Sequence, residues 1–128
     1  MRVAKQLSVM LPNKPGQLAA LCRKLAAAKV NIRAVSVNET TEQGIVRLVV
    51  DKPGVAQKLV KDAKLGLVVT EVILVEMVNK PGVLGKVAAR LAKAKVNVEY
   101  VYGSTGPGAR DAVAVFGVDD LGKAKKLV

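Results

Sequence analysis

Two copies of a short polar turn carry the residues of this chain that are best suited to binding chemistry. Asn13-Lys14-Pro15-Gly16-Gln17-Leu18 recurs 66 positions later as Asn79-Lys80-Pro81-Gly82-Val83-Leu84. The Asn side chain can both donate and accept hydrogen bonds, Gly lets a ligand approach the backbone closely, and Pro pre-sets the turn. A helix that begins at such a turn presents free N–H groups and the positive end of its dipole. The motif therefore favours binding of a carboxylate, with an ammonium group on the Asn oxygen.

The same residues also have a purely structural interpretation, because Asn caps turns, Pro starts helices and Gly bends the chain. A second repeated pair, Asn31 and Asn97, enters the strand that follows each predicted helix. That end of a helix lies away from the Pro-Gly turn of the same unit. Asn31 or Asn97 could therefore meet such a turn only across two units packed together. The residues alone leave both interpretations, ligand site and turn former, open.

Other reaction chemistry has little support. The chain has one Cys and no His, so we expect no transition-metal site, no cofactor and no catalytic activity. Cys22 lies within the apolar stripe of a predicted helix and is interpreted as a core residue. The loop from Gly103 to Arg110 is rich in Gly but lacks the Lys-Ser/Thr end of a phosphate-binding loop, and it joins two predicted strands. We interpret it as a hairpin turn.

The repeat extends well beyond the turn. Residues 13–35 and 79–101 are identical at 12 of 23 positions, which indicates two copies of one folding unit. We predict modules at residues 1–71 and 72–128. Apolar residues that recur with period 2 predict strands, and those with period 3.6 predict helices. In the first copy the predicted order is strand, helix, strand, strand, helix, strand. This is the split βαβ arrangement of an α+β, ferredoxin-like βαββαβ fold. The predicted elements are strands 3–11, 32–37, 45–50 and 66–70, with a helix that Pro15 opens and another over 53–63.

The second copy is shorter. Its expected elements are strands 72–78, 98–102 and 111–118, a helix over 81–94, and a last helix over 119–127 that Asp119 or Asp120 caps. No sequence remains for a final strand, which in this fold lies beside the first strand of the unit. We therefore expect an open apolar edge at Val72–Val78. Such edges seldom stay unpaired, so the sequence predicts a homodimer.

Composition narrows the class of protein. The chain is half apolar, has no stretch long enough to span a bilayer, and is expected to be cytoplasmic. Its net charge is +11, with 12 Lys/Arg against 4 Asp/Glu in residues 1–66. Most of these charges fall singly on predicted helix faces, which favours solubility and steering over a specific site. The strands offer no aromatic platform for bases. A basic nucleic-acid-binding module and a purely structural interaction module remain the alternative functions, and any nucleic-acid binding should be non-specific.

The Asn-x-Pro-Gly-x-Leu turn, the apolar helix and the Val-Asn-Ile/Val segment after it together resemble the signature of ACT domains. The resemblance covers nearly the whole chain, twice, and is close to tandem ACT proteins without a catalytic domain. It implies βαββαβ modules that bind amino acids at module interfaces and regulate metabolic enzymes. The chain is thus expected to be a non-enzymatic, amino-acid-sensing regulatory protein.

The resemblance also implies site residues. In the family, the Asn before Pro-Gly and the backbone of the turn contact the polar head of the ligand, and the second Asn often comes from a neighbouring module. The first expected site is Asn13, Pro15, Gly16, Gln17 and Leu18 with Asn31 and Ile32. The second is Asn79, Gly82, Val83 and Leu84 with Asn97 and Val98. Some family members carry a His three residues before the first Asn, where this chain has Met10 and Glu76. Leu11, Leu18, Ile32 and Met10 are expected to line the side-chain pocket and to favour a small apolar ligand such as a branched-chain amino acid.

Overall fold

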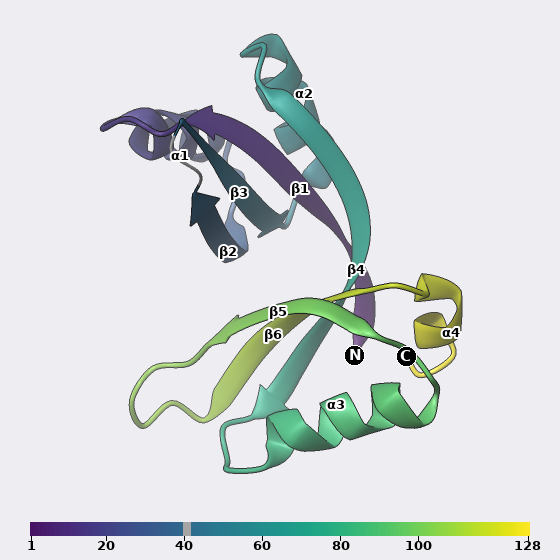
Figure 1. Ribbon diagram of the computed structural model, residues 1–128. Helices are drawn as coiled ribbons and strands as arrows, with labels where there is room; N and C mark the ends of the chain where they lie inside the picture. The colour runs from purple at the N-terminus through teal and green to yellow at the C-terminus, as the bar shows by residue number, and fades with distance from the viewer. Residues whose placement is uncertain (40–41) are drawn as a thin grey trace. The chain divides into compact units, whose positions relative to one another are not determined.

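The computed structural model describes residues 1–39 and 42–128 as a mixed α+β protein built from two compact units (Figure 1). One unit comprises Lys5–Thr70, and the other comprises Met1–Ala4 together with Glu71–Val128. We call them the N-terminal unit and the C-terminal unit. The elements run β1 (Arg2–Pro12), α1 (Gln17–Ala27), β2 (Ile32–Glu39), β3 (Gln43–Val50), α2 (Pro53–Asp62), β4 (Gly66–Val78), α3 (Val83–Lys93), β5 (Val98–Ser104), β6 (Asp111–Val118) and α4 (Leu121–Lys125). The module boundary between residues 71 and 72 stays a prediction.

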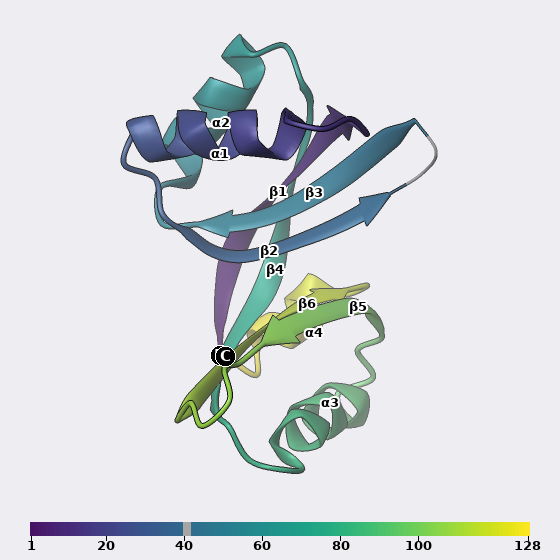
Figure 2. The ribbon, with the colours of Figure 1, turned by 90° about the vertical axis from the view of Figure 1, so that its left-hand side faces the viewer.

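In the N-terminal unit the strand order is β2-β3-β1-β4, the order of the ferredoxin-like fold. β3 pairs antiparallel with both β1 and β2, so that Val9 faces Val46 and Val35 faces Leu48. Alternate residues of these strands point to the face that α1 and α2 cover (Figure 2). The core consists of apolar side chains from β1, α1, β3 and α2, with Val30 from the turn after α1: Leu7, Val9, Leu11, Leu21, Leu25, Val30, Val46, Leu48, Val50, Ala56 and Val60.

The C-terminal unit repeats this design with a smaller helical layer. β6 pairs antiparallel with β4 and β5, placing Ile73 opposite Phe116 and Val101 beside it on the other strand. Buried side chains of β4, β6, α3 and α4 form its core: Ile73, Val75, Val87, Leu91, Val96, Ala114, Phe116 and Ala124. As predicted, the chain contributes no strand after its last helix.

The open edge expected at Val72–Val78 is not present, and that expectation was wrong. β4 lies between β6 and β1, and the first residues of β1 belong to the C-terminal unit. Met1 and Val3 pack against the core of this unit, and the Arg2 guanidinium lies 3.8 Å from the Glu76 carboxylate. Residues 1–4 thus occupy the place of the missing strand. The open edge therefore no longer supports a homodimer, and the homodimer stays a prediction.

Four elements have bounds that differ from expectation: β4, α4, α1 and α3. Residues 66–70 and 72–78 form one continuous strand, β4, and α4 is only five residues long. As expected, Asp120 caps α4, since its Oδ1 accepts from the main-chain N–H of Lys123 at 3.0 Å. Helices α1 and α3 start at Gln17 and Val83 rather than at Pro15 and Pro81. Among the described residues, no helix is long and apolar enough to cross a membrane.

Candidate ligand-binding site

Each Pro-Gly motif forms a tight turn before its helix. The main-chain N–H of Gln17 bonds the carbonyl of Lys14 at 3.4 Å, and Val83 bonds Lys80 in the same way at 3.3 Å. Gly16 between them has φ 87° and ψ −12°. Pro at the second position and a positive φ at the third are the marks of a type II turn. The positive φ excludes Gly16 from the helix, which is why Pro15 precedes α1 instead of opening it.

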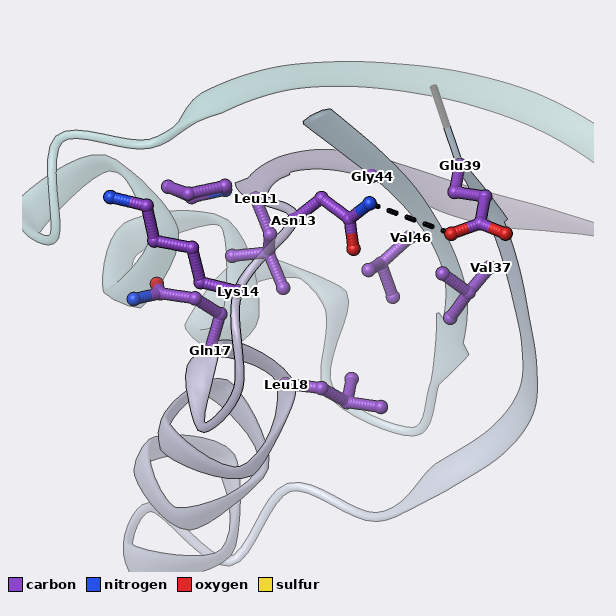
Figure 3. A pocket seen from close by; sticks show the side chains of 10 residues that line it. Leu11, Asn13, Lys14, Gln17, Leu18, Val37, Glu39, Gly44 and Val46 are labelled. Carbon is purple, nitrogen blue, oxygen red and sulfur yellow. Dashed lines mark hydrogen bonds between the residues drawn. The ribbon is translucent and has the colours of Figure 1, made fainter. Parts of the chain in front are cut away.

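The first turn borders a pocket on the N-terminal unit, which we call the Asn13 pocket (Figure 3). Its volume is about 310 Å³. Its walls come from the end of β1, the turn and first residues of α1, and the neighbouring strands β2 and β3. The lining residues are Leu11, Pro12, Asn13, Lys14, Gln17, Leu18, Val37, Glu39, Gly44 and Val46. The pocket therefore combines an apolar floor with an amide, an ammonium and a carboxylate at its rim.

The second turn borders the corresponding pocket on the C-terminal unit, the Asn79 pocket, whose volume is about 460 Å³. It is formed by the end of β4, the turn before α3, and strands β5 and β6. The lining residues are Met77, Val78, Asn79, Lys80, Leu84, Val101, Tyr102, Gly103, Ser104, Thr105, Ala112, Val113 and Ala114. The two turns thus carry equivalent pockets at equivalent places in the repeat.

The two turn asparagines attach their turns to the neighbouring hairpin. The main-chain N–H of Asn13 donates to the Glu42 carbonyl at 2.9 Å, and that of Asn79 donates to the Arg110 carbonyl at 2.9 Å. The side-chain amide of Asn79 donates to the Ala109 carbonyl at 2.9 Å, whereas the amide of Asn13 lies 3.5 Å from Glu39 Oε2. Figure 3 shows the Asn13 amide nitrogen directed at Glu39 and its oxygen turned away from that carboxylate. Both asparagines therefore hold their turns against the neighbouring hairpin, as the structural interpretation predicts.

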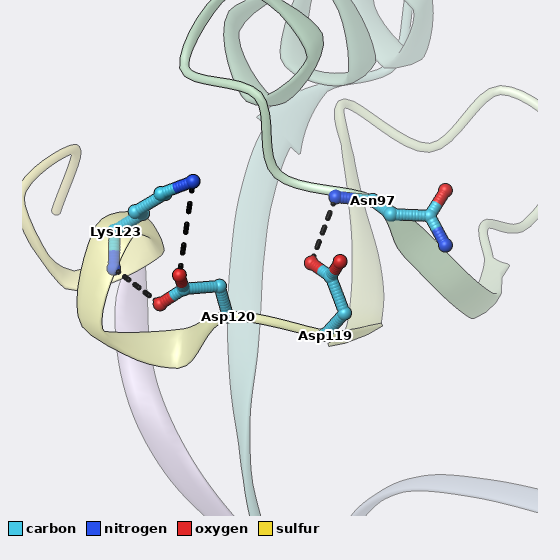
Figure 4. A network of polar contacts seen from close by, with 4 residues as sticks. All are labelled: Asn97, Asp119, Asp120 and Lys123. Atoms are coloured by element: carbon cyan, nitrogen blue, oxygen red, sulfur yellow. Dashed lines mark hydrogen bonds and ion pairs between the residues drawn. The ribbon is translucent and has the colours of Figure 1, made fainter.

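The second pair of asparagines does not line either pocket. The main-chain N–H of Asn31 donates to Asp51 Oδ1 at 2.8 Å, and the Asp51 N–H returns a bond to the Asn31 carbonyl at 3.1 Å. Asn97 and Asp119 repeat this exchange at 2.9 and 3.1 Å (Figure 4). These bonds join the start of β2 or β5 to the segment after β3 or β6. Both asparagine side chains are exposed at the end of the helix remote from the turn.

The structure brings together only part of the expected site. Asn13, Gln17 and Leu18 share one pocket, and Asn79 and Leu84 share the other. Pro15, Gly16 and Gly82 shape the turns, while Val83 does not line the Asn79 pocket. Ile32 and Val98 are half-buried and pack against the cores. Of the residues expected around a ligand side chain, Leu11 and Leu18 line the Asn13 pocket, whereas Met10 and Ile32 do not.

The residues that β2, and β5 with the residue after it, contribute were not predicted from the sequence. Val37 and Glu39 line the Asn13 pocket, and Gly103 and Thr105 line the Asn79 pocket. Their signal was present but weak, because these positions lie 66 residues apart within the repeat without being identical. No group of three or more potential metal ligands occurs among residues 1–39 and 42–128.

The comparisons with known proteins agree with this geometry. A family model described as an ACT domain pair matches residues 1–128. The crystal structure of protein BT0572 from Bacteroides thetaiotaomicron is 33% identical, with a TM-score of 0.88 over 98% of this chain and 85% of that one. The ligand-free regulatory subunit of aspartate kinase from Thermus thermophilus has a TM-score of 0.66 at 17% identity, covering 91% of this chain and 88% of that one. None of the curated proteins matches this chain.

The corresponding subunit from Thermus flavus has a TM-score of 0.60 at 18% identity over 89% and 81% of the two chains. These two subunits share the fold with the present chain. The family match over the whole chain and the 33% identity to a structure of nearly the same extent go further than the fold. This chain belongs to the family of ACT domain pairs.

Proposed function

We propose that this ACT domain pair is a non-enzymatic regulatory protein that senses a small amino acid. ACT domains are regulatory modules, and ligand sensing is the role that fits the family match. The observation that carries the proposal is the repeated pocket, in which the Pro-Gly turn, an Asn and a Lys border an apolar floor. The same fold occurs in a protein described as the regulatory subunit of aspartate kinase.

The chemistry of each pocket suits a zwitterion. The Lys14 or Lys80 ammonium and the first amides of the helix would hold the ligand carboxylate. The side-chain oxygen of Asn13 or Asn79 would accept from the ligand ammonium, as an amide oxygen can. Gly16 and Gly82 would let the ligand approach the backbone, and Gln17 would border it in the Asn13 pocket.

We also propose that the chain forms a homodimer. The pockets are open to solvent. The exposed Asn31 and Asn97 follow the C-terminal ends of α1 and α3, whereas the pockets lie at the N-terminal ends of these helices, so neither Asn reaches the pocket of its own unit. In a homodimer, Asn31 and Ile32 of one protomer could complete the Asn13 pocket of another, and Asn97 and Val98 the Asn79 pocket. Ligand binding would then stabilise one packing of modules over another, and this difference in affinity would be the regulatory signal. The proposed setting is the cytoplasm.

The first experiment is a thermal-shift screen of the purified chain with each of the twenty amino acids. A ligand that binds only the folded state must raise the melting temperature. Light scattering with and without the best ligand would test the homodimer. If no amino acid raises the melting temperature, the sensing proposal fails and the pockets are reduced to features of the fold.

The second experiment tests the asparagines. Asn13→Asp removes the amide N–H that is directed at Glu39 and sets two carboxylates side by side, so the side chain should leave its position and affinity should fall by about 1–3 kcal/mol. Asn79→Asp tests the other pocket in the same way. Asn38→Asp is the matched control, since Asn38 is exposed on β2 and lies outside the pocket lining. Unchanged affinity by calorimetry in both pocket variants would leave these asparagines as turn formers.

A further inference from the structure

The two pockets are built from the same positions of the repeat. An offset of 66 relates residues before the hairpin loop, and an offset of 68 relates residues after it, because the loop is longer in the second copy. Leu11 and Leu18 thus correspond to Met77 and Leu84, and Val46 corresponds to Ala114. Lining residues outside the loop can therefore be compared position by position.

The clearest differences lie on β2 and β5. Val37 in the Asn13 pocket is replaced by Gly103, and Glu39 is replaced by Thr105. The strand pairing confirms these equivalences, because Val37 faces Val46 and Gly103 faces Ala114. Both substitutions replace a larger or charged side chain in the N-terminal unit by a smaller or neutral one in the C-terminal unit.

The change at Val37 and Gly103 alters the space that a ligand can occupy. The Val37 side chain, 51% exposed, stands over the floor of the Asn13 pocket. Gly103 places no side chain over its cross-strand partner Ala114, which is buried like Val46 but smaller. A Cβ added at Gly103 would approach the Val113 carbonyl oxygen to 2.8 Å and the Ala114 Cβ to 3.2 Å. The Asn79 pocket is accordingly the larger, at about 460 Å³ against 310 Å³.

The change at Glu39 and Thr105 alters the charge. The Glu39 carboxylate is directed toward Asn13 at the rim of its pocket, on the side opposite Lys14 (Figure 3). The Thr105 hydroxyl instead donates to the Asp111 carbonyl at 2.9 Å, so it is engaged within its own hairpin. The Asn13 pocket therefore offers both a cation and an anion, whereas the Asn79 pocket offers the Lys80 ammonium above walls of Met77, Leu84 and Val101.

We propose that the two pockets select different amino acids. The Asn79 pocket takes an amino acid with a large apolar side chain, and the Asn13 pocket takes a small polar one and excludes the large apolar one. Position 37/103 sets the size limit, and position 39/105 sets the charge at the rim. This inference rests on the proposed sensing function and divides it between two ligands, so that one chain can respond to two signals.

Site-resolved NMR of the ¹⁵N-labelled chain tests the inference, with L-leucine and L-serine as probes. Backbone amides of Gly103 and Ala112 report the Asn79 pocket, and those of Gly44 and Val46 report the Asn13 pocket. L-leucine should shift the first set at concentrations at least about tenfold lower than those needed for the second, the scale on which a pocket discriminates by size. L-serine should show the reverse preference.

Two exchanged variants assign the preference to residues. Thr105→Glu should weaken L-leucine binding at the Asn79 pocket by about tenfold or more, because a carboxylate replaces a neutral hydroxyl beside the apolar walls of the site. Glu39→Thr should weaken L-serine binding at the Asn13 pocket by a similar factor. Glu99→Thr and Thr70→Glu are the matched controls, since both residues are exposed and outside the lining. If Thr105→Glu does not fold, Leu84→Trp is the alternative variant, because the larger side chain fills the Asn79 pocket. Leu84 is 47% exposed, so this change does not disturb the core.

The outcomes separate the inference from the function beneath it. Equal shifts of both sets of amides by L-leucine, or L-leucine binding that survives Thr105→Glu and Leu84→Trp, would overturn the division of ligands while keeping the sensing function. No shift at either pocket with either probe, and no amino acid raising the melting temperature, would overturn both.

Discussion

The two units share one design but complete their sheets differently. In the N-terminal unit all four strands and both helices come from Lys5–Thr70. The second helix of the C-terminal unit, α4, has five residues, whereas the second helix of the N-terminal unit, α2, has ten. The fourth strand of the C-terminal unit comes from Met1–Ala4. Repeats with the same motifs therefore differ in how far they depend on distant sequence. The difference teaches that a truncated repeat is completed by strand pairing with a segment from the opposite end of the chain.

The cores reflect the same difference. α2 contributes Ala56 and Val60 to the core of the N-terminal unit, whereas α4 contributes only Ala124 to the other. Apolar area removed from water is the main source of folding free energy. A shorter helix covers less of the sheet, so the C-terminal unit relies more on the packing of Met1 and Val3. Its stability should therefore respond more strongly to changes in residues 1–4.

The largest expected effect is the loss of residues 1–4. A variant beginning at Lys5 loses the packing of two apolar side chains and the strand hydrogen bonds beside β4, and we expect the C-terminal unit to be destabilised by about 2–5 kcal/mol. Hydrogen exchange should show faster exchange at Ile73 and Val75, with Val46 and Leu48 changed much less. Arg2→Ala is the control, because an exposed ion pair contributes only about 0–1 kcal/mol.

The same truncation tests what covers β4. With its edge uncovered, the strand should pair with another chain, since unpaired apolar edges promote association. Light scattering at micromolar concentration should show larger species than for the full chain. Unchanged exchange at Ile73 and unchanged assembly would mean that residues 1–4 contribute little to the sheet and would remove the contrast between the units.

Matched core truncations come next in size. Leu25 and Leu91 occupy equivalent positions of α1 and α3 and are 1% and 0% exposed. Replacing either with Ala leaves a cavity and should lower the free energy of unfolding by about 2–5 kcal/mol. Because the C-terminal unit has the smaller helical layer, Leu91→Ala should make this unit unfold locally while the N-terminal unit stays folded. Hydrogen exchange should detect this local unfolding. Hydrogen exchange that rises equally in both units for both variants would contradict this.

Much of the fold could be predicted because its signals are local. Periodic apolar residues place the helices and strands, and the repeated turn marks where α1 and α3 begin. The role of Met1–Ala4 could not be predicted, because it depends on pairing with residues about 70 positions away, for which a single sequence carries no signal. Pro15 was misplaced because Pro favours both the first turn of a helix and the second position of a type II turn. Gly16 decides between the two.

The site was predictable to a similar degree. The turn residues Asn13 and Asn79 could be found by type and spacing, but the residues of β2 and β5 that differ between pockets could not. Glu39 and Thr105 lie near polar loops where any hydrophilic residue is unremarkable. They line pockets only because the hairpins fold back beside the turns. Asp51 and Asp119 had a weak signal, since each follows an Asn by about one hairpin and precedes a helix.

The smallest effect concerns the feature that the two units share most closely, the turn glycines. Gly16 and Gly82 have the same φ of 87°, and a Cβ added at either would meet no atom within 4 Å. Any cost of Gly16→Ala or Gly82→Ala is therefore conformational rather than steric, and we expect about 1–2 kcal/mol in each, nearly equal in the two units. Gly85 in α3 is the control: it also meets no atom within 4 Å but is helical, so Gly85→Ala should stabilise by about 0.5–1 kcal/mol. Chemical denaturation of the three variants measures all of these differences. A cost at Gly16 well above that at Gly82 would show that the two turns are not equivalent and that the contrast between the units extends to the start of their helices.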